Sequence, residues 1–118
     1  MQAQGAGQIC VTNSVRGVRA GAEAGLYTAS KFAVRGLMQC ARLELRPLGI
    51  KVGSVLPGGI DTPWWQDEAR GGRPKGSVNT AKFLTADEVA EALLMLINQA
   101  AGSDIEEIFL EPGGTRVA

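Results

Sequence analysis

The sequence predicts an α/β fold in which a parallel sheet of about three strands is flanked by two long helices. Short apolar, β-prone runs alternate with amphipathic helical segments, and the joints between them are rich in Gly and Pro. The order begins strand, helix, strand, which favours parallel pairing through a right-handed crossover. A chain of 118 residues has room for one domain with a real core.

The first part of the chain is expected to hold one strand and one long helix. Residues 1–8 are polar and Gly-rich and predict a tail before a strand at 9–12, and residues 15–26 form a Gly-containing loop. From 27 to 48 the apolar residues recur at helical spacing, although Pro47 weakens the last turn. They form a wide stripe that should face a core: Phe32, Val34, Leu37, Met38, Ala41, Leu45 and Leu48.

The second part is expected to hold two more strands and a shorter helix. An apolar, β-branched run predicts a strand at 50–56, and residues 61–84 form a long irregular stretch. Thr85 opens a Thr-x-x-Glu capping box, followed by apolar residues at helical spacing over 89–100. A last strand is predicted at 105–110, so residues 1–118 should form a single domain.

Composition narrows the function classes. Basic and acidic residues number 12 each, and a neutral chain has no general field to attract nucleic-acid phosphates. There is no histidine, which excludes Ser-His-Asp and Cys-His catalysis and imidazole metal sites, so we expect no metal centre. Cys10 and Cys40 lie in apolar runs and predict reduced core thiols in a cytoplasmic protein. Neither a signal peptide nor a membrane span is apparent, so we expect no membrane partner.

Polar residues follow the first predicted strand, at the edge where open parallel sheets bind ligands. Ser14 ends this strand, Tyr27 begins the next helix, and Lys31 lies four residues later on the same helix face. A free phenol has a pKa of about 10, and a nearby ammonium favours its phenolate. The three residues would then form an acid–base site that needs no histidine. The alternative is a surface Tyr–Lys pair and a Ser that caps a turn, and these features alone favour that alternative.

Three motifs in order resemble the short-chain dehydrogenase/reductase family. Residues 27–31, Tyr-Thr-Ala-Ser-Lys, are similar to its Tyr-x-x-x-Lys signature, and Ser14 precedes Tyr27 by 13 residues, the family's usual spacing. Residues 57–62, Pro-Gly-Gly-Ile-Asp-Thr, resemble its Pro-Gly-x-[Val/Ile]-x-Thr segment. The resemblance covers roughly 7–114 and implies part of a Rossmann-like, doubly wound parallel sheet.

The resemblance assigns roles to the catalytic candidates. Ser14 would orient the carbonyl or alcohol oxygen of a small-molecule substrate. Tyr27 would give the proton to the carbonyl in reduction or take it from the alcohol in oxidation. Lys31 would stabilise the phenolate of Tyr27 and hydrogen-bond the nicotinamide ribose. The resemblance therefore implies NAD or NADP as the cofactor, with the choice between them open.

The resemblance also implies a cofactor pocket and a substrate loop. The nicotinamide pocket would be lined, besides Tyr27 and Lys31, by Pro57, Gly58, Ile60 and Thr62. Residues 61–84 would form the substrate loop, and Trp64 and Trp65 would start it. The Trp pair is equally well interpreted as a hydrophobic anchor under that loop.

The motifs found are those of the family's C-terminal, catalytic half. The family's Gly-x-x-x-Gly-x-Gly turn, which holds the pyrophosphate, has no counterpart, because Gly17, Gly21 and Gly25 are loop glycines. We therefore expect this chain alone to bind dinucleotide weakly or not at all. The alternative function is a truncated, inactive fragment that acts only by association. The helix at 27–48 resembles the family's main dimer helix, which implies a homo-oligomer.

Overall fold

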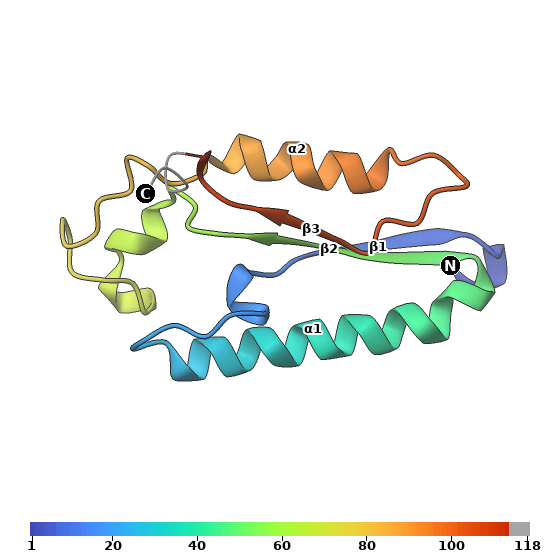
Figure 1. Cartoon of the computed structure of the whole chain (residues 1–118), viewed down its shortest axis with the longest axis horizontal. Helices are drawn as coiled ribbons and strands as arrows, with labels where there is room; N and C mark the ends of the chain where they lie inside the picture. Colours follow the sequence, from blue (N-terminus) through green and yellow to red (C-terminus); the bar gives the residue numbers. More distant parts are fainter. Residues whose placement is uncertain (114–118) are drawn as a thin grey trace.

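Three parallel strands form the centre of the computed structural model, which describes residues 1–113 (Figure 1). The strands are β1 (Gly7–Thr12), β2 (Ile50–Pro57) and β3 (Glu107–Leu110), in the spatial order β1-β2-β3. β2 lies in the middle and is buried along almost its whole length, as expected for a strand covered on both faces. Residue 114, the last that the resemblance covers, lies outside the described residues.

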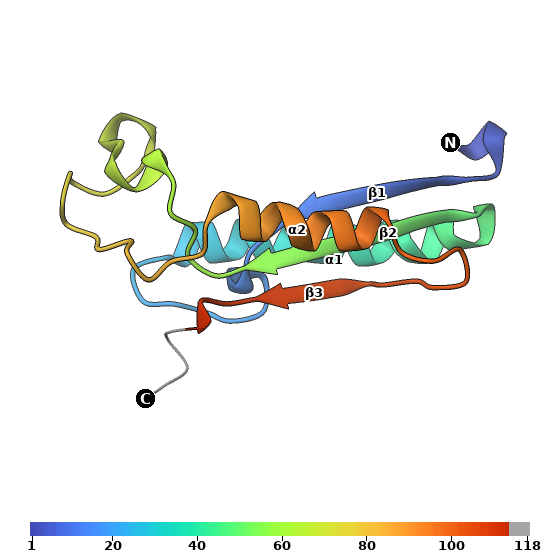
Figure 2. The ribbon, with the colours of Figure 1, turned by 90° about the horizontal axis from the view of Figure 1, so that it is seen from above.

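The two long helices cover opposite faces of this sheet. α1 (Gly25–Leu45) connects β1 to β2, and α2 (Ala86–Ile97) connects β2 to β3 (Figures 1 and 2). The α/β class and the parallel, Rossmann-like arrangement predicted from the sequence are confirmed. Within residues 1–113, no helix is both long and apolar enough to cross a membrane.

Three strand boundaries differ from the prediction, because pairing between strands lengthens or shortens the segments that local composition favours. β1 begins at Gly7 rather than Ile9, since Gly7 pairs in register with Ile50 at the start of β2. The polar residues before it are not all a tail, because Gln2–Gln4 form a 3₁₀ turn. β3 is shorter than predicted and begins at Glu107, which pairs with Ser54. β2 extends one residue further, to Pro57.

Both helices are also shorter than predicted. α1 begins two residues earlier, at Gly25, and ends at Leu45, after which the segment that contains Pro47 forms a 3₁₀ turn. A proline in a helix removes one backbone donor and crowds the preceding turn, which explains this early end. The predicted capping box of α2 is confirmed, since Glu88 N–H donates to Thr85 Oγ1 and Thr85 N–H donates to the Glu88 carboxylate. α2 then ends at Ile97.

The main apolar cluster lies on the α2 side of the sheet. It is built from Val55 of β2, Leu84 of the long loop, and three residues of α2: Val89, Ala92 and Leu96. Cys10 packs against this cluster and is half-buried, whereas Cys40 on α1 is exposed. The prediction of two core thiols is therefore wrong for Cys40, because the apolar run around it belongs to an uncovered part of α1.

No residue of α1 is fully buried, so its apolar stripe does not face a closed core as predicted. Three members of the stripe, Phe32, Leu37 and Leu48, are exposed. Half-burial is the most that Val34 and the other members reach. The helix packs on a three-stranded sheet that is too narrow to cover the whole stripe.

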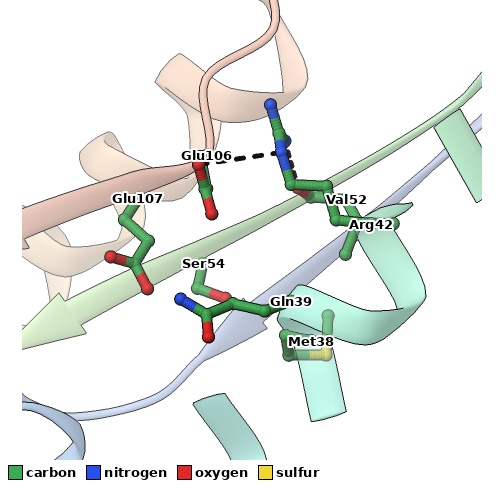
Figure 3. Close-up of a pocket in the computed structure, with 7 residues that line it drawn as sticks. All are labelled: Met38, Gln39, Arg42, Val52, Ser54, Glu106 and Glu107. Carbon is green, nitrogen blue, oxygen red and sulfur yellow. Dashed lines mark hydrogen bonds and ion pairs between the residues drawn. The ribbon is translucent and has the colours of Figure 1, made fainter. Parts of the chain in front are cut away.

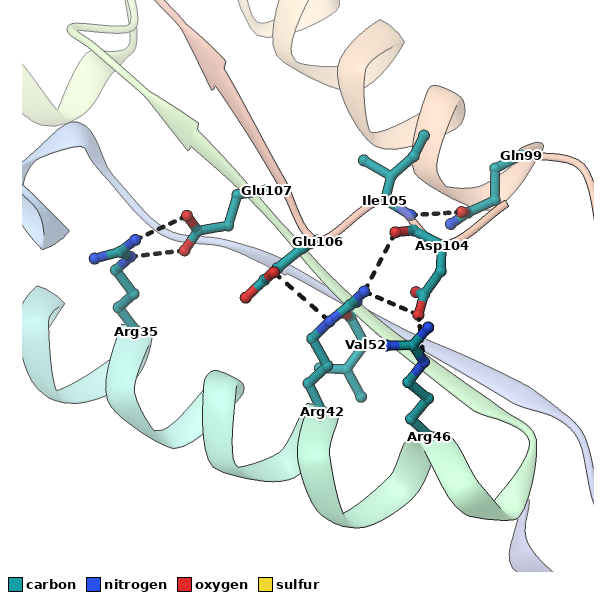
Figure 4. A network of polar contacts seen from close by, with 9 residues as sticks. All are labelled: Arg35, Arg42, Arg46, Val52, Gln99, Asp104, Ile105, Glu106 and Glu107. Atoms are coloured by element: carbon teal, nitrogen blue, oxygen red, sulfur yellow. Dashed lines mark hydrogen bonds and ion pairs between the residues drawn. The ribbon is translucent and has the colours of Figure 1, made fainter. Parts of the chain in front are cut away.

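α1 covers the buried Val52 and Leu56 of β2 and is further attached by three arginines, which we call the arginine row: Arg35, Arg42 and Arg46 (Figure 4). Arg35 forms a two-pronged ion pair with Glu107 of β3, with N–O distances of 2.7 and 2.9 Å. This hydrogen-bonded carboxylate raises the pKa of the Arg35 guanidinium further above its ordinary value. The geometry joins α1 directly to the start of β3.

Arg42 is the most deeply placed member of the arginine row. It donates to the carbonyls of Val52 and Asp104, at 2.7 and 3.2 Å, and pairs with the Asp104 carboxylate at 2.8 Å. Arg46 shares that carboxylate from an exposed position, at 3.2 Å. Arg42 therefore links three elements, α1, β2 and the segment before β3, with one side chain.

Candidate functional site

The candidate site lies where β1 and β2 end and α1 begins (Figure 1). Parallel strands present their carboxyl ends at one edge, and ligands bind outside that edge in open α/β sheets. Ser14 follows β1, and Tyr27 and Lys31 lie in the first two turns of α1. The structure thus places all three catalytic candidates at the same end of the sheet.

Tyr27 and Lys31 lie together on the surface of α1. The Lys31 ammonium nitrogen is 5.4 Å from the centroid of the Tyr27 ring, within the range of a cation–π contact. Tyr27 is 47% exposed, and no hydrogen bond in the described part of the chain uses its phenol. The phenol is thus free to meet a ligand with an ammonium beside it.

Ser14 is buried, and its side chain has a local partner. Its hydroxyl oxygen accepts a hydrogen bond from the backbone N–H of Arg16 at 3.1 Å and caps the short 3₁₀ turn Val15–Gly17. Within residues 1–113, no hydrogen bond joins Ser14 to Tyr27. The turn-capping alternative therefore describes one real contact of Ser14, while its hydroxyl proton is left for another acceptor.

Asn13 is a site residue that the sequence analysis did not select. It is buried, and its side-chain amide donates to the backbone carbonyl of Lys31 at 3.2 Å. The available signal was a polar residue next to Ser14 at the end of a buried strand. Such residues are common in turns, so the contact with α1 could not be read from the sequence.

The segment after β2 turns away from the sheet in a defined conformation. Gly58 N–H donates to the Leu110 carbonyl at 2.8 Å, which extends the contact between β2 and β3 beyond Pro57. Ile60 pairs with Leu84 in an isolated parallel bridge, so the two ends of the long loop are joined. Thr62 is half-buried and begins the next 3₁₀ turn without a side-chain cap hydrogen bond. Its hydroxyl is therefore available for a ligand.

The two tryptophans of the loop have different environments. Trp65 donates its indole N–H to the Ile60 carbonyl at 2.8 Å and packs edge-on against Phe83, with ring centroids 5.3 Å apart. Trp64 is 42% exposed and donates to the Arg70 carbonyl at 3.2 Å. Trp65 thus fits the anchor interpretation, and Trp64 packs edge-on against Trp65, with ring centroids 5.0 Å apart, while part of its ring stays at the surface.

Gly59 is required where the loop closes. A Cβ atom at this position would lie 2.9 Å from the Phe83 ring, closer than side-chain atoms approach one another. The absence of a side chain therefore lets Phe83, and through it Trp65, pack beside the Pro-Gly-Gly segment.

Two hollows lie near these elements. An open one on the loop is lined by Asp61, Thr62, Pro63, Gln66, Asp67, Glu68 and Lys75. A narrow crevice, with room for about one water molecule, lies between α1, β2 and the start of β3 (Figure 3). It includes Met38, which is 11 residues and about 16 Å along α1 from Tyr27. Only the first hollow borders a predicted site residue.

A metal site is not formed by the described residues. Across residues 1–113, no group of three or more His, Cys, Asp or Glu side chains is arranged to hold a metal ion. The side chains of Ser14, Tyr27 and Lys31 offer a hydroxyl, a phenol and an ammonium group at this edge.

Comparison with known proteins identifies the family. A model of the short chain dehydrogenase family matches residues 1–71, which include Ser14, the Tyr-x-x-x-Lys segment and the Pro-Gly-Gly segment. The chain belongs to the short-chain dehydrogenase family. The resemblance inferred from the motifs is thereby confirmed.

The similar proteins include curated dehydrogenases and solved structures of the family. The chain is 37% identical over 97 residues to a 3-alpha-(or 20-beta)-hydroxysteroid dehydrogenase of Mycobacterium tuberculosis, a match that covers 75% of this chain and 37% of that protein. It is 32% identical over 111 residues to an uncharacterised oxidoreductase of Staphylococcus haemolyticus, covering 94% of this chain and 45% of the relative. The chain thus spans less than half the length of these relatives.

Solved structures of the family superpose well on the chain. Acetoin dehydrogenase from Enterobacter cloacae is 27% identical, with a TM-score of 0.74 that covers 99% of this chain and 46% of that structure. A metagenomic short-chain oxidoreductase in complex with NADP is 30% identical, with a TM-score of 0.68 over 95% of this chain and 41% of that structure. The fold of the chain therefore corresponds to part of a short-chain dehydrogenase.

Proposed function

We propose that this chain supplies the acid–base residues of an NAD(P)-dependent oxidoreductase that reduces a carbonyl or oxidises an alcohol. The observation that carries the proposal is the half-exposed Tyr27 with the Lys31 ammonium beside its ring, at the carboxyl edge of the sheet. A surface Tyr–Lys pair elsewhere would mean little, but here it lies in a chain of the dehydrogenase family. Ser14 lies at the same edge and is the third proposed catalytic residue.

The proton transfer in this proposal uses only residues of the chain. In reduction, the Tyr27 phenol donates its proton to the substrate carbonyl oxygen as that oxygen becomes an alcohol, and Ser14 hydrogen-bonds the same oxygen. The Lys31 ammonium stabilises the phenolate that remains. In oxidation the phenolate takes the alcohol proton. The nicotinamide, when bound, supplies or accepts the hydride.

The residues at the edge fit the nicotinamide end of the cofactor. We assign its contacts to Tyr27 and Lys31 together with Pro57, Gly58, Ile60 and Thr62. The Thr62 hydroxyl, which makes no cap hydrogen bond, supports this assignment. The Ile60 carbonyl is already held by Trp65, so Ile60 would offer its backbone from a fixed position.

The described residues contain no glycine-rich turn between a strand and a helix that would hold a pyrophosphate. Gly17 is buried in the turn after β1, and Gly21 lies in the loop before α1. The adenosine and pyrophosphate ends of a dinucleotide contribute several factors of ten to affinity, each worth about 1.4 kcal/mol. We therefore expect weak dinucleotide binding by this chain alone.

The second candidate function is association without catalysis. Among the described strands, β1 pairs with β2 alone, and three large apolar residues of the α1 stripe are exposed. Open strand edges and apolar surfaces favour pairing with another chain. In either case we propose a homo-oligomer formed through residues 27–48, in the cytoplasm, where Cys10 and Cys40 stay reduced.

Calorimetry and a carbonyl-reduction screen separate the two candidates. NADH and NADPH are titrated into the purified chain, and micromolar binding would contradict the expectation of weak affinity. The screen uses saturating cofactor and compares the wild type with Lys31→Met and with Lys82→Met, an exposed lysine outside the site. The oxidoreductase proposal predicts loss of activity only for Lys31→Met. No activity with any carbonyl, combined with stable self-association, would favour the second candidate.

A further inference from the structure

A buried side-chain amide connects the two elements that carry the candidate catalytic residues. Asn13 is only 4% exposed, and its amide nitrogen donates to the Lys31 carbonyl at 3.2 Å. Its backbone N–H donates to the Val55 carbonyl at 2.8 Å, which holds the residue in line with the β1–β2 ladder. Asn13 is therefore fixed by the sheet on one side and bonded to α1 on the other.

The chemistry of this contact settles which way the amide points. A helix carbonyl keeps a second lone pair after it accepts its own backbone bond, and only the NH₂ group of Asn can donate to it. The other amide atom, Asn13 Oδ1, is buried and has no hydrogen-bond partner within residues 1–113. An unpaired buried acceptor costs free energy, so the hydrogen bond to the Lys31 carbonyl has to offset the cost of burying the Asn13 amide.

Gly17 encloses the same contact. A Cβ atom added at Gly17 would lie 3.0 Å from Asn13 Nδ2 and 3.1 Å from the Lys31 carbonyl oxygen. Gly17 is itself buried, so the chain passes directly over the hydrogen bond and leaves no space beside it. A hydrogen bond enclosed in this way is not weakened by competition with water.

The hydrogen bond between Asn13 and the Lys31 carbonyl lies close to the candidate catalytic residues. Among the side-chain hydrogen bonds that join α1 to other parts of residues 1–113, the next along the helix is that of Arg35 with Glu107, one turn beyond Lys31. The first turns of α1, which carry Tyr27, are thus held to the sheet edge through Asn13. Ser14 is the next residue in the chain, so its position depends on that of Asn13.

We propose that Asn13 is a positioning residue, which sets the placement of Tyr27 and Lys31 relative to Ser14 by tying the Lys31 carbonyl to the end of β1. The catalytic meaning of this placement rests on the proposed function, whereas the tie itself is a property of the fold. A displacement of about 1 Å in an active site costs about a hundredfold in rate, so one hydrogen bond at this point has a large effect.

Tyr27 gives a direct readout, because it is the only tyrosine in the chain. Protein grown with 3-fluorotyrosine shows one ¹⁹F resonance, from position 27, whether or not the chain turns over a substrate. Asn13→Asp has nearly the same shape but cannot donate to the Lys31 carbonyl at neutral pH. The matched control is Asn98→Asp, at an exposed position after α2.

The proposal predicts that Asn13→Asp shifts or broadens the ¹⁹F resonance, while Asn98→Asp leaves it unchanged. Gly17→Ala, which intrudes on the same hydrogen bond, should shift it as well. Tryptophan emission, from Trp64 and Trp65, should stay as in the wild type. If Asn13→Asp does not fold, Asn13→Ser, which is too short to reach the carbonyl, takes its place.

An unchanged ¹⁹F resonance in both site variants would overturn the proposal. A shifted resonance accompanied by changed tryptophan emission would also overturn it, since Asn13 would then support the whole fold. If the chain reduces a carbonyl, the Asn13 variant should lose about tenfold or more in kcat with KM within twofold. Failure of the proposed function leaves the ¹⁹F result intact, so the two can be told apart.

Discussion

The two helices are attached to the sheet by different means. α2 is 12 residues long and buries three of them, Val89, Ala92 and Leu96, in the apolar core. α1 is 21 residues long and buries none of its own, although it covers Val52 and Leu56 of β2; its polar attachments include the arginine row and the bond from Asn13. Apolar packing stabilises a helix over its whole face, whereas polar contacts fix it at chosen points. The helix with the candidate site is thus placed without being covered, which leaves Tyr27 accessible.

The largest expected difference between the helices is in the cost of losing a leucine side chain. Leu96 of α2 is fully buried, so Leu96→Ala should lower the free energy of unfolding by about 3 to 5 kcal/mol. Leu37 of α1 is 67% exposed in the single chain, so Leu37→Ala should change the free energy of unfolding of the monomer by less than about 0.5 kcal/mol. Urea unfolding of both variants, at protein concentrations low enough to keep the chain monomeric, measures the two values. Equal losses under these conditions would show that α1 is packed within the chain as α2 is.

Arg42 should be the most important single attachment of α1. Arg42→Gln removes a mostly buried ion pair and two hydrogen bonds to carbonyls, and leaves the Asp104 carboxylate with only the exposed Arg46. We expect the free energy of unfolding to fall by about 2 kcal/mol. The matched control, Arg46→Gln, should cost less than about 0.5 kcal/mol. A larger loss for Arg46→Gln in the same urea series would contradict the role given to Arg42.

The two tryptophans of the loop should also differ, with a smaller effect on stability. Trp65→Ala removes the hydrogen bond to Ile60 and the ring contact with Phe83, so the loop should open more often. Trypsin cleavage after Arg70 and Lys75 should become about tenfold faster, which corresponds to about 1.4 kcal/mol. Trp64→Ala should change the rate about threefold at most, because Trp64 is 42% exposed and its ring contacts Trp65 but not Phe83. Faster cleavage of the Trp64→Ala chain than of the Trp65→Ala chain would show that Trp64, not Trp65, anchors the loop.

The two thiols test burial on the two sides of the sheet. Burial raises the pKa of the Cys10 thiol, and Cys40 is exposed on α1. Iodoacetamide at neutral pH should therefore alkylate Cys40 several-fold faster than Cys10, because the thiolate is the reacting form. The raised pKa also means that the folded chain holds this proton more tightly, so stability is lost as pH rises through the alkaline range. Mass spectrometry of partly labelled protein measures the two rates, and preferential labelling of Cys10 would be inconsistent with this packing.

Sequence reasoning predicted the parts of the molecule that depend on local patterns. The Thr85 capping box, the apolar run of β2 and the order of elements were all readable from residue spacing. Pairing decided the start of β1 at Gly7, which no local propensity favours. Helical periodicity gave the apolar stripe of α1 but could not tell that a narrow sheet leaves Phe32 and Leu37 exposed. The exposure of these residues depends on which elements pack beside α1.

The same division holds for the candidate site. The i, i+4 spacing predicted that Tyr27 and Lys31 share a face, and their ring–ammonium contact agrees with it. The capping contact of Ser14 with Arg16 was one of the two interpretations available. The Asn13–Lys31 hydrogen bond joins residues 18 apart through a turn whose path the sequence does not specify. Long-range polar contacts of this kind require the structure.

The central claim is that α1 presents Tyr27 as the acid–base group of a carbonyl reduction, and Tyr27→Phe tests it most directly. The substitution removes one hydroxyl from a half-exposed side chain whose phenol makes no hydrogen bond within residues 1–113. The stability of the chain should therefore stay within about 0.5 kcal/mol. Where the wild type reduces a carbonyl substrate with NADH or NADPH, kcat should fall at least about a hundredfold. A Tyr27→Phe chain with unchanged kcat would contradict the account.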